Sequence, residues 1–189
     1  MRMRYALAGL FFVLLCSCSP VPETEFALAS VTPASARIDG ALAVVTVEPA
    51  SRDRAVYPLP RSLTPLLPLW QAALKDAVTR QGIFRPEAAR RVSLVVKVLE
   101  FSLSGNILSV FARYQLFADP AGNPLFSADI MSNTGLSSLA TGVTSLDDPG
   151  VATQNRTQVI RAIQDNITQF LDQLEAFVRQ PRGAPPARP

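Results

Sequence analysis

Hydrophobic and polar positions along the middle of the chain follow the periods of strands and helices. Residues 41–47 form an apolar run rich in β-branched side chains, which predicts a strand buried on both faces and ended by Pro49. Apolar positions at helical spacing then predict a helix over about 65–81. Thr64 suits the N-cap of this helix, and Gly82 suits its C-terminal stop.

Three further strands are predicted in succession. Residues 92–103 are strongly strand-like, and a tight turn at 104–106 leads into residues 108–117, where apolar and more polar positions alternate. A second turn, over 119–124, leads into a shorter strand at 125–131. Because both connections are short, the three strands are expected to form an antiparallel meander.

The strongest helical pattern lies near the C-terminus. After a polar segment over about 132–150, an apolar stripe runs at helical spacing from Ile160 to Phe177, and Pro181 ends it. The predicted order is therefore β-α-β-β-β-α. This order is typical of an α+β two-layer sandwich, with a four-stranded, mostly antiparallel sheet and both helices on one face.

The first residues predict a secretory signal. Arg2 and Arg4 precede an apolar stretch over 5–15, which is too short to span a bilayer permanently. This stretch ends in Leu15-Cys16-Ser17-Cys18, which resembles the lipobox of bacterial lipoproteins. In that family the last cysteine is cut free of the signal and acylated, so the resemblance implies that Cys18 becomes the lipidated first residue.

The two cysteines also fit two alternative interpretations. One is an ordinary cleaved signal, and the other is a metal or disulfide element, which the absence of histidine and of a third cysteine disfavours. Acyl chains on Cys18, palmitate among them, would anchor the protein to a membrane. Ser19, where an aspartate would retain such proteins in the inner membrane, implies the periplasmic face of the outer membrane, with the inner membrane as the alternative.

Composition shifts divide the chain into four parts. Residues 1–17 are the predicted signal peptide, and residues 18–37, rich in Pro, Ser, Ala and Thr, read as a lipidated tether. Residues 38–180 form one predicted globular domain of ordinary size. Residues 181–189 form a tail rich in Pro and Arg, which is expected to be disordered.

Charge and residue types exclude several functions. The chain has 18 Lys and Arg against 15 Asp and Glu, and loss of Arg2 and Arg4 leaves 16 against 15, so no basic face for nucleic acid is indicated. With no histidine, Ser-His-Asp and Cys-His catalysis are excluded. The only lysines, Lys75 and Lys97, favour solvation over a Ser-Lys dyad.

No cofactor or metal site is expected. The adjacent acids Asp147 and Asp148 lack further oxygen ligands at regular spacing, so they favour a turn or the entry to a helix over a cation site. No glycine-rich phosphate loop is present. The sequence therefore predicts a protein that is not an enzyme.

The pattern of the domain resembles a wider group of small periplasmic lipoproteins. The resemblance lies in a helix ending GIF, the strand RVSLVVKVLEFSLS, the segment ARYQLFADPAGNPLFSADI and a closing amphipathic helix. The group includes the auxiliary lipoproteins of lipid-trafficking ABC transporters and, more loosely, the lipopolysaccharide-assembly lipoprotein. It implies a non-catalytic accessory or interaction subunit of an envelope complex, such as one for lipid or lipopolysaccharide transport, with an envelope protein as its partner.

The sheet offers a candidate surface for such a partner. Phe111, Phe117, Leu125 and Met131 are expected on the face opposite the helices, where a partner would cover them. Strand addition at an open sheet edge is a second route to a partner. The alternative function is a lipid- or glycan-binding module, which would use a groove between the helices and the sheet.

Overall fold

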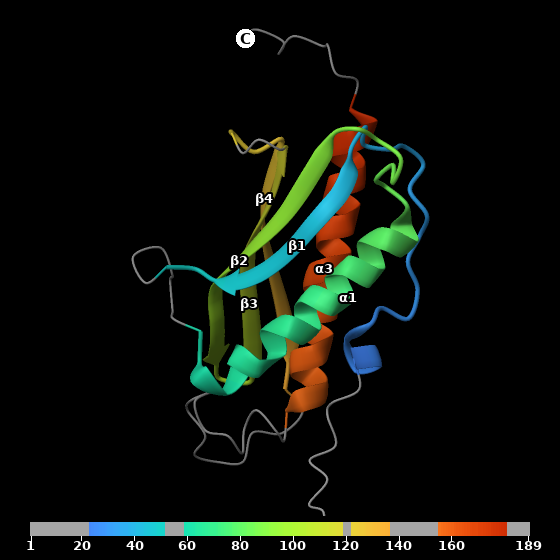
Figure 1. Cartoon of the computed structure of the whole chain (residues 1–189). Helices are drawn as coiled ribbons and strands as arrows, with labels where there is room; N and C mark the ends of the chain where they lie inside the picture. The colour runs from blue at the N-terminus through green and yellow to red at the C-terminus, as the bar shows by residue number, and fades with distance from the viewer. Residues whose placement is uncertain (1–22, 52–58, 119–121, 137–154, 181–189) are drawn as a thin grey trace, which may run out of the picture.

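The structure is a computed structural model of the chain, and it describes residues 23–51, 59–118, 122–136 and 155–180. It has the predicted α+β architecture, a four-stranded mixed sheet with two long helices (Figure 1). In chain order the elements are η1 (Glu23–Phe26), β1 (Ala41–Pro49), η2 (Arg61–Leu66), α1 (Leu67–Gln81), β2 (Arg91–Ser104), β3 (Ile107–Ala118), β4 (Phe126–Gly135) and α3 (Arg156–Arg179).

The strands lie side by side in the order β1-β2-β3-β4, so β1 and β4 are the edges of the sheet. The helical connection through α1 makes β1 parallel to β2, while β2, β3 and β4 form the predicted antiparallel meander. Gly105 adopts a φ of 57° in the two-residue turn between β2 and β3. This left-handed conformation favours glycine, because a side chain there would be strained.

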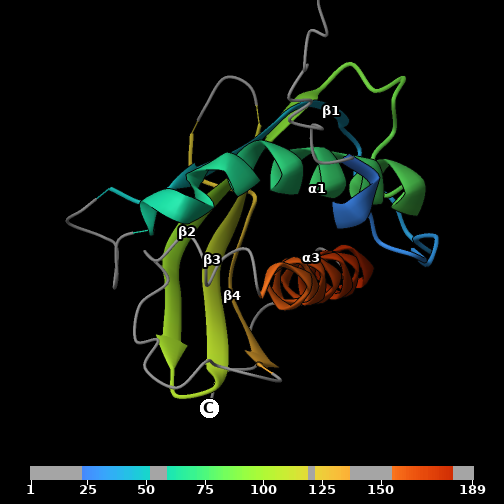
Figure 2. The same cartoon turned by 90° about the horizontal axis from the view of Figure 1, so that it is seen from below.

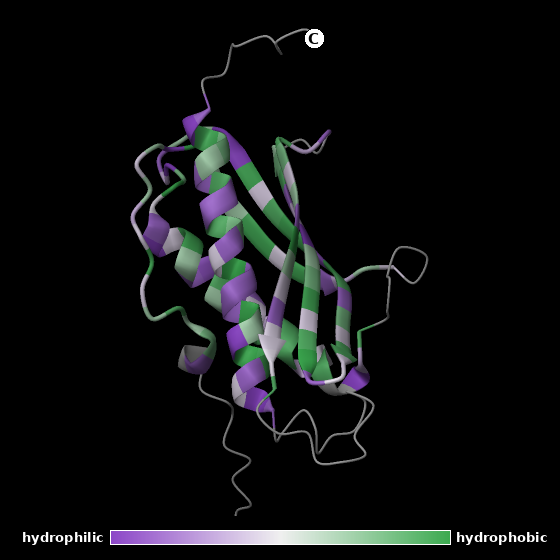
Figure 3. Ribbon diagram, turned by 180° about the vertical axis from the view of Figure 1, so that it is seen from behind, coloured by the Kyte–Doolittle hydropathy of each residue, from purple (hydrophilic) through white to green (hydrophobic). Residues whose placement is uncertain are grey.

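Both helices pack on the same face of the sheet, as Figure 2 shows from below. The alternating pattern along β3 and β4 turns one apolar row of each strand inward against α3, and Figure 3 shows this alternation. The aromatic rings of Tyr114 and Phe170 stack there, with centroids 4.4 Å apart. Gly82 ends α1 with a φ of 66°, as its position in the sequence predicted.

A buried polar network joins α3 to the inner face of the sheet. Asn166 is fully buried, and its Oδ1 accepts a hydrogen bond of 2.8 Å from the hydroxyl of Tyr114. Its amide nitrogen donates to the carbonyl oxygens of Val110 and Ile130, each at 3.2 Å. Burial raises the pKa of Tyr114 far above its usual range, so the phenol stays protonated and donates.

Residues 23–37 differ from the predicted tether, because they pack along the two helices. Phe26 is 0% exposed. Arg80 donates to the carbonyl of Leu28 at 2.6 Å, and Gln164 donates to the carbonyl of Ala27 at 3.0 Å. The Pro- and Ser-rich composition suggests an extended tether, but Phe26 and Leu28 are buried in the core, and Val31 and Ala34 pack against it. The folded domain therefore includes residues 23–37, which lie before its predicted start at residue 38.

Two strand predictions also need correction. The strand over 41–47 is not buried on both faces: Val44 is 52% exposed on the outer face, which none of the described helices covers. The last strand, predicted over 125–131, continues to Gly135. Its apolar pattern ends early because Ser132 and Thr134 are polar, although both side chains are buried against the helical layer. The hydroxyl of Ser132 donates to the carbonyl of Ala162 at 2.8 Å, which satisfies it in that position.

Candidate functional site

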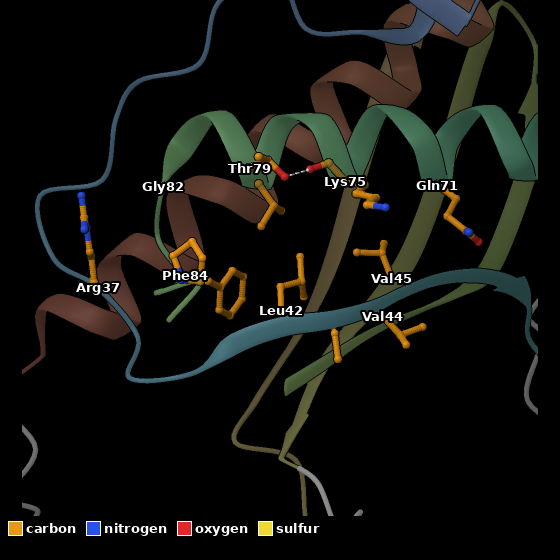
Figure 4. Close-up of a pocket in the computed structure, with 12 residues that line it drawn as sticks. Arg37, Leu42, Val44, Val45, Gln71, Lys75, Thr79, Gly82 and Phe84 are labelled. Carbon is orange, nitrogen blue, oxygen red and sulfur yellow. Dashed lines mark hydrogen bonds between the residues drawn. The ribbon is translucent and has the colours of Figure 1, made fainter. Parts of the chain in front are cut away.

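A cleft lies between α1 and the edge strand β1, with a volume of about 570 Å³. Figure 4 shows the C-terminal half of α1 on one side of it and the first half of β1 on the other. A volume of roughly 300–1,000 Å³ is typical of ligand pockets. The cleft is lined by Arg37, Leu42, Ala43, Val44, Val45, Gln71, Lys75, Val78, Thr79, Gly82, Phe84 and Pro86.

One end of the cleft is closed by the turn that follows α1. The left-handed conformation of Gly82 reverses the chain, so that Phe84 forms an isolated parallel bridge with Ile38. The amide of Ile38 donates to the carbonyl of Ile83 at 2.7 Å, which fixes this bridge. Phe84 is thereby held as a buried aromatic wall at the end of the cleft.

The free edge of β1 lines the cleft with backbone groups. The amide of Val47 donates to Oε1 of Gln71 on α1 at 3.3 Å, so it points away from β2. Because alternate residues of a strand present their backbone groups to the same side, Val45 also turns its N–H and C=O toward this edge. A register shift between Leu42 and Val44 marks a bulge beside it. The cleft thus combines an apolar wall with an open strand edge.

The charge of the cleft is positive. Arg37 and Lys75 are the charged residues among those that line it, and no acidic side chain is among them. In Figure 4 Lys75 lies on the α1 wall, above Val45.

The outer face of the sheet carries a row of charges across all four strands. Glu48, Lys97, Arg113 and Asp129 are consecutive partners in the strand register. Lys97 pairs with Glu48, and Arg113 donates two hydrogen bonds to Asp129, at 2.6 and 2.7 Å. The hydrogen bonds from Arg113 hold the pKa of Asp129 below its usual range. Lys97 is therefore a paired surface cation.

The four residues predicted as a partner face do not form one surface. Phe111 and Met131 are cross-strand partners on the outer face, and Met131 is 50% exposed. Phe117 lies on the same face but six residues along β3 from Phe111, a distance of about 20 Å, with the charged row between them. Leu125 is half-buried and packs against the core, because it precedes the regular part of β4.

A groove between the helices and the sheet is predicted from the sequence for the alternative function, but the residues that line the cleft are not identified there. Arg37 lies in the segment interpreted as a tether, and Phe84 follows a helix end without any periodicity. The sequence places Lys75 on a helix face and predicts only a solvated side chain there. A signal was present in Leu42, Ala43 and Val44, where the apolar run breaks the alternation expected of an edge strand.

Other predicted sites lie outside the described residues. Cys18 and the acids Asp147 and Asp148 are among them. In the ranges that the structure does describe, no group of three or more His, Cys, Asp or Glu side chains is arranged to hold a metal ion. Likewise, none of the described helices is both long and apolar enough to cross a bilayer.

Comparison by sequence finds no match, neither to a protein-family model nor to a curated protein. Comparison by structure does find similar proteins. The chain matches XCC0632 from Xanthomonas campestris with a TM-score of 0.49 and 15% identity, over 80% of this chain and 91% of the other. It matches CT253 from Chlamydia trachomatis with a TM-score of 0.48 and 10% identity, over 74% and 98%.

A bacterial lipoprotein is also among the similar structures. The minor lipoprotein from Acinetobacter baumannii matches with a TM-score of 0.36 and 16% identity, over 71% of this chain and 91% of the other. At identities of 10–16% and TM-scores of 0.36–0.49, these similarities assign no activity, ligand or partner to the chain.

Proposed function

We propose that this chain is a lipoprotein of the bacterial cell envelope, anchored through acyl chains on Cys18, and that it serves as a non-catalytic accessory subunit of an envelope complex. The lipobox-like Leu15-Cys16-Ser17-Cys18 supports the anchor. The residue after Cys18 is Ser19, which favours the periplasmic face of the outer membrane over the inner membrane.

The observation that carries the accessory role is the open edge of β1 inside the cleft. An extended segment of a partner protein can pair with the outward backbone groups of Val45 and place alternate side chains against Val78 and Phe84. Lys75 and Arg37 favour an acidic residue in that segment, because the described residues that line the cleft include no acid. Gln71 occupies the amide of Val47 and so limits the pairing at that end.

Site-specific photocrosslinking in the native host tests this role. A photoreactive residue at Ala43, beside the cleft, should give one defined protein adduct, and the same residue at Thr168, exposed on α3, should not. Lys75→Ala should weaken the adduct, whereas Lys97→Ala, the matched change of the only other lysine, should leave it. Equal adducts from both positions, or none in any growth condition, would count against an accessory role through the cleft.

A lipid- or glycan-binding module is the second candidate function, and the cleft favours it as well. Its location between helix and sheet, its volume of about 570 Å³ and its positive charge suit a small amphiphile with an acidic group. Titration with a fluorescent fatty acid tests this candidate. Saturable binding that Val45→Trp abolishes by filling the cleft would support it, and the absence of saturable binding would argue for the protein partner.

A further inference from the structure

The distance between the proposed anchor and the folded domain is short. Cys18 precedes Glu23, the first residue of η1, by five positions. Five residues reach at most about 18 Å even when fully extended. Since Phe26 is fully buried between the helices, η1 cannot swing away to lengthen this connection. If Cys18 is acylated, as the proposed function requires, the η1 end of the domain stays close to the bilayer.

Ion pairing and register show which other parts of the domain lie at the η1 end. Glu25 pairs with Arg156, the first residue of α3, at 3.0 Å. The hydroxyl of Ser132 on β4 donates to the carbonyl of Ala162 on α3, so these two residues lie at the same level. From this level α3 runs back six residues, about 9 Å, to its start at Arg156, and β4 runs on three residues, about 10 Å, to its end at Gly135. The start of α3 is therefore level with the end of β4.

The tip of the β2–β3 hairpin shares this end. Leu136, which follows β4, donates its amide to the carbonyl of Asn106 at 2.7 Å. Figure 1 shows η1, the start of α3 and the hairpin at the same end of the molecule. Ile107 stands beside the turn and is 46% exposed, one of three large apolar side chains so exposed in the described structure. We name η1, the first turn of α3 and the Gly105–Ile107 tip the hairpin end.

From this geometry we propose that the hairpin end rests on the bilayer that holds the acyl chains, with Ile107 in contact with the lipid. The hairpin end is thus proposed to bind a lipid bilayer, because the short connection from Cys18 to Glu23 keeps this end near the membrane. Exposed apolar side chains at a membrane interface gain from burial among the acyl chains. This inference rests on the proposed lipid anchor.

Charge alone would place the opposite end of the domain against the membrane. Arg85, Arg90 and Arg91 are exposed there, beyond the end of α1, and would attract anionic lipid. The connection from Cys18 cannot reach that far, because the first half of β1 pairs with β2 about 30 Å from the hairpin tip. The cleft lies at that distance too. It therefore faces away from the anchoring membrane, toward partners in the periplasm.

Fluorescence quenching on vesicles tests the orientation. In the lipidated chain the sulfur of Cys18 is blocked and Cys16 has left with the signal, so an introduced cysteine is the only free thiol. Ile107→Cys and Arg85→Cys are labelled with an environment-sensitive dye and bound to vesicles of phosphatidylcholine and phosphatidylglycerol that carry doxyl-labelled lipid. The dye at position 107 should be quenched at least twofold more than the dye at position 85. Equal quenching, or stronger quenching at position 85, overturns the proposal.

A longer connection provides the matched control. Insertion of twelve Gly and Ser residues between Pro22 and Glu23 leaves the folded domain unchanged and should lower the quenching at position 107 by at least half. Unchanged quenching shows that the connection does not set the orientation, and it overturns the proposal. Failure of the chain to float with the vesicles would instead overturn the anchor and the proposed function with it, so the two failures are distinct.

Discussion

Asn166→Ala tests whether the buried polar network holds α3 on the sheet. The variant leaves the hydroxyl of Tyr114, which is fully buried, without the acceptor that lies 2.8 Å away. An unsatisfied buried hydroxyl costs about 1–3 kcal/mol. The two hydrogen bonds from the amide to Val110 and Ile130 are lost as well, but those carbonyls also take part in the sheet. We expect a loss of about 3 kcal/mol, a large part of the ~5–15 kcal/mol of a typical domain.

Urea unfolding measures this loss directly. Trp70 is the only tryptophan and is buried, so its emission reports the whole transition. Tyr114→Phe should cost about 1–2 kcal/mol, because it leaves Oδ1 of Asn166 without its donor. The double variant should cost at least about 1 kcal/mol less than the sum of the two, since both changes remove the same hydrogen bond.

A neighbouring residue serves as the control. Asp165 precedes Asn166 on α3 but is exposed, so Asp165→Ala should change the free energy of unfolding by no more than about 0.5 kcal/mol. The reasoning is refuted if Asn166→Ala costs no more than this control. It is also refuted if the effects at positions 114 and 166 add to within about 0.3 kcal/mol, since independent sites behave in that way.

Three further predictions concern the N-terminal segment and one close contact. The amide and the hydroxyl of Ser35 both donate to the carboxylate of Glu175, and these bonds lower its pKa. The contribution of the carboxylate to stability is therefore present above its ordinary pKa of about 4.3 and is lost as pH falls. The difference in unfolding free energy between wild type and Glu175→Gln should vanish in acid, and a difference that persists there would contradict the assignment. Phe26→Ala should cost about 3–5 kcal/mol in urea unfolding and open residues 23–37 to limited proteolysis, because the side chain is fully buried; continued protection would show that the other contacts suffice. Gly40→Ala should cost about 1–2 kcal/mol, because its Cβ would stand 2.9 Å from a methyl group of Val92. The control Gly135→Ala meets no atom within 4 Å and should be near neutral, so equal thermal stability of the two variants would disprove the steric reasoning.

Local sequence rules predicted most of the fold. Gly82 ends a helix and Gly105 closes a hairpin, both in the left-handed conformation. Because other residues are strained in that conformation, the glycines in the sequence indicate where the helix and the hairpin turn. The stripe from Ile160 to Phe177 predicted α3, since a continuous apolar stripe has to be covered. These features depend only on neighbours in the chain, which a single sequence displays.

Features that depend on distant residues were not predictable in this way. Nothing near Phe26 shows that two helices form a slot for its ring. Val44 belongs to an apolar run like that of a buried strand, and only its place at the sheet edge leaves it exposed. The cleft arises from the spacing between β1 and α1, which brings Lys75 and Arg37 to the same cavity. Such properties are set by the tertiary arrangement and not by periodicity.

The packing of residues 23–37 against both helices also affects the order in which the domain folds. Glu25 and Ser35 bind side chains that follow them by 131 and 140 positions. A chain is synthesised from its N-terminus, so residues 23–37 can meet α1 early but meet α3 only when the last helix has been made. A polypeptide that stops short of α3 lacks these contacts and leaves the inner side of the sheet beside α3 open to water. Proteases and chaperones would then treat that fragment as an unfolded protein.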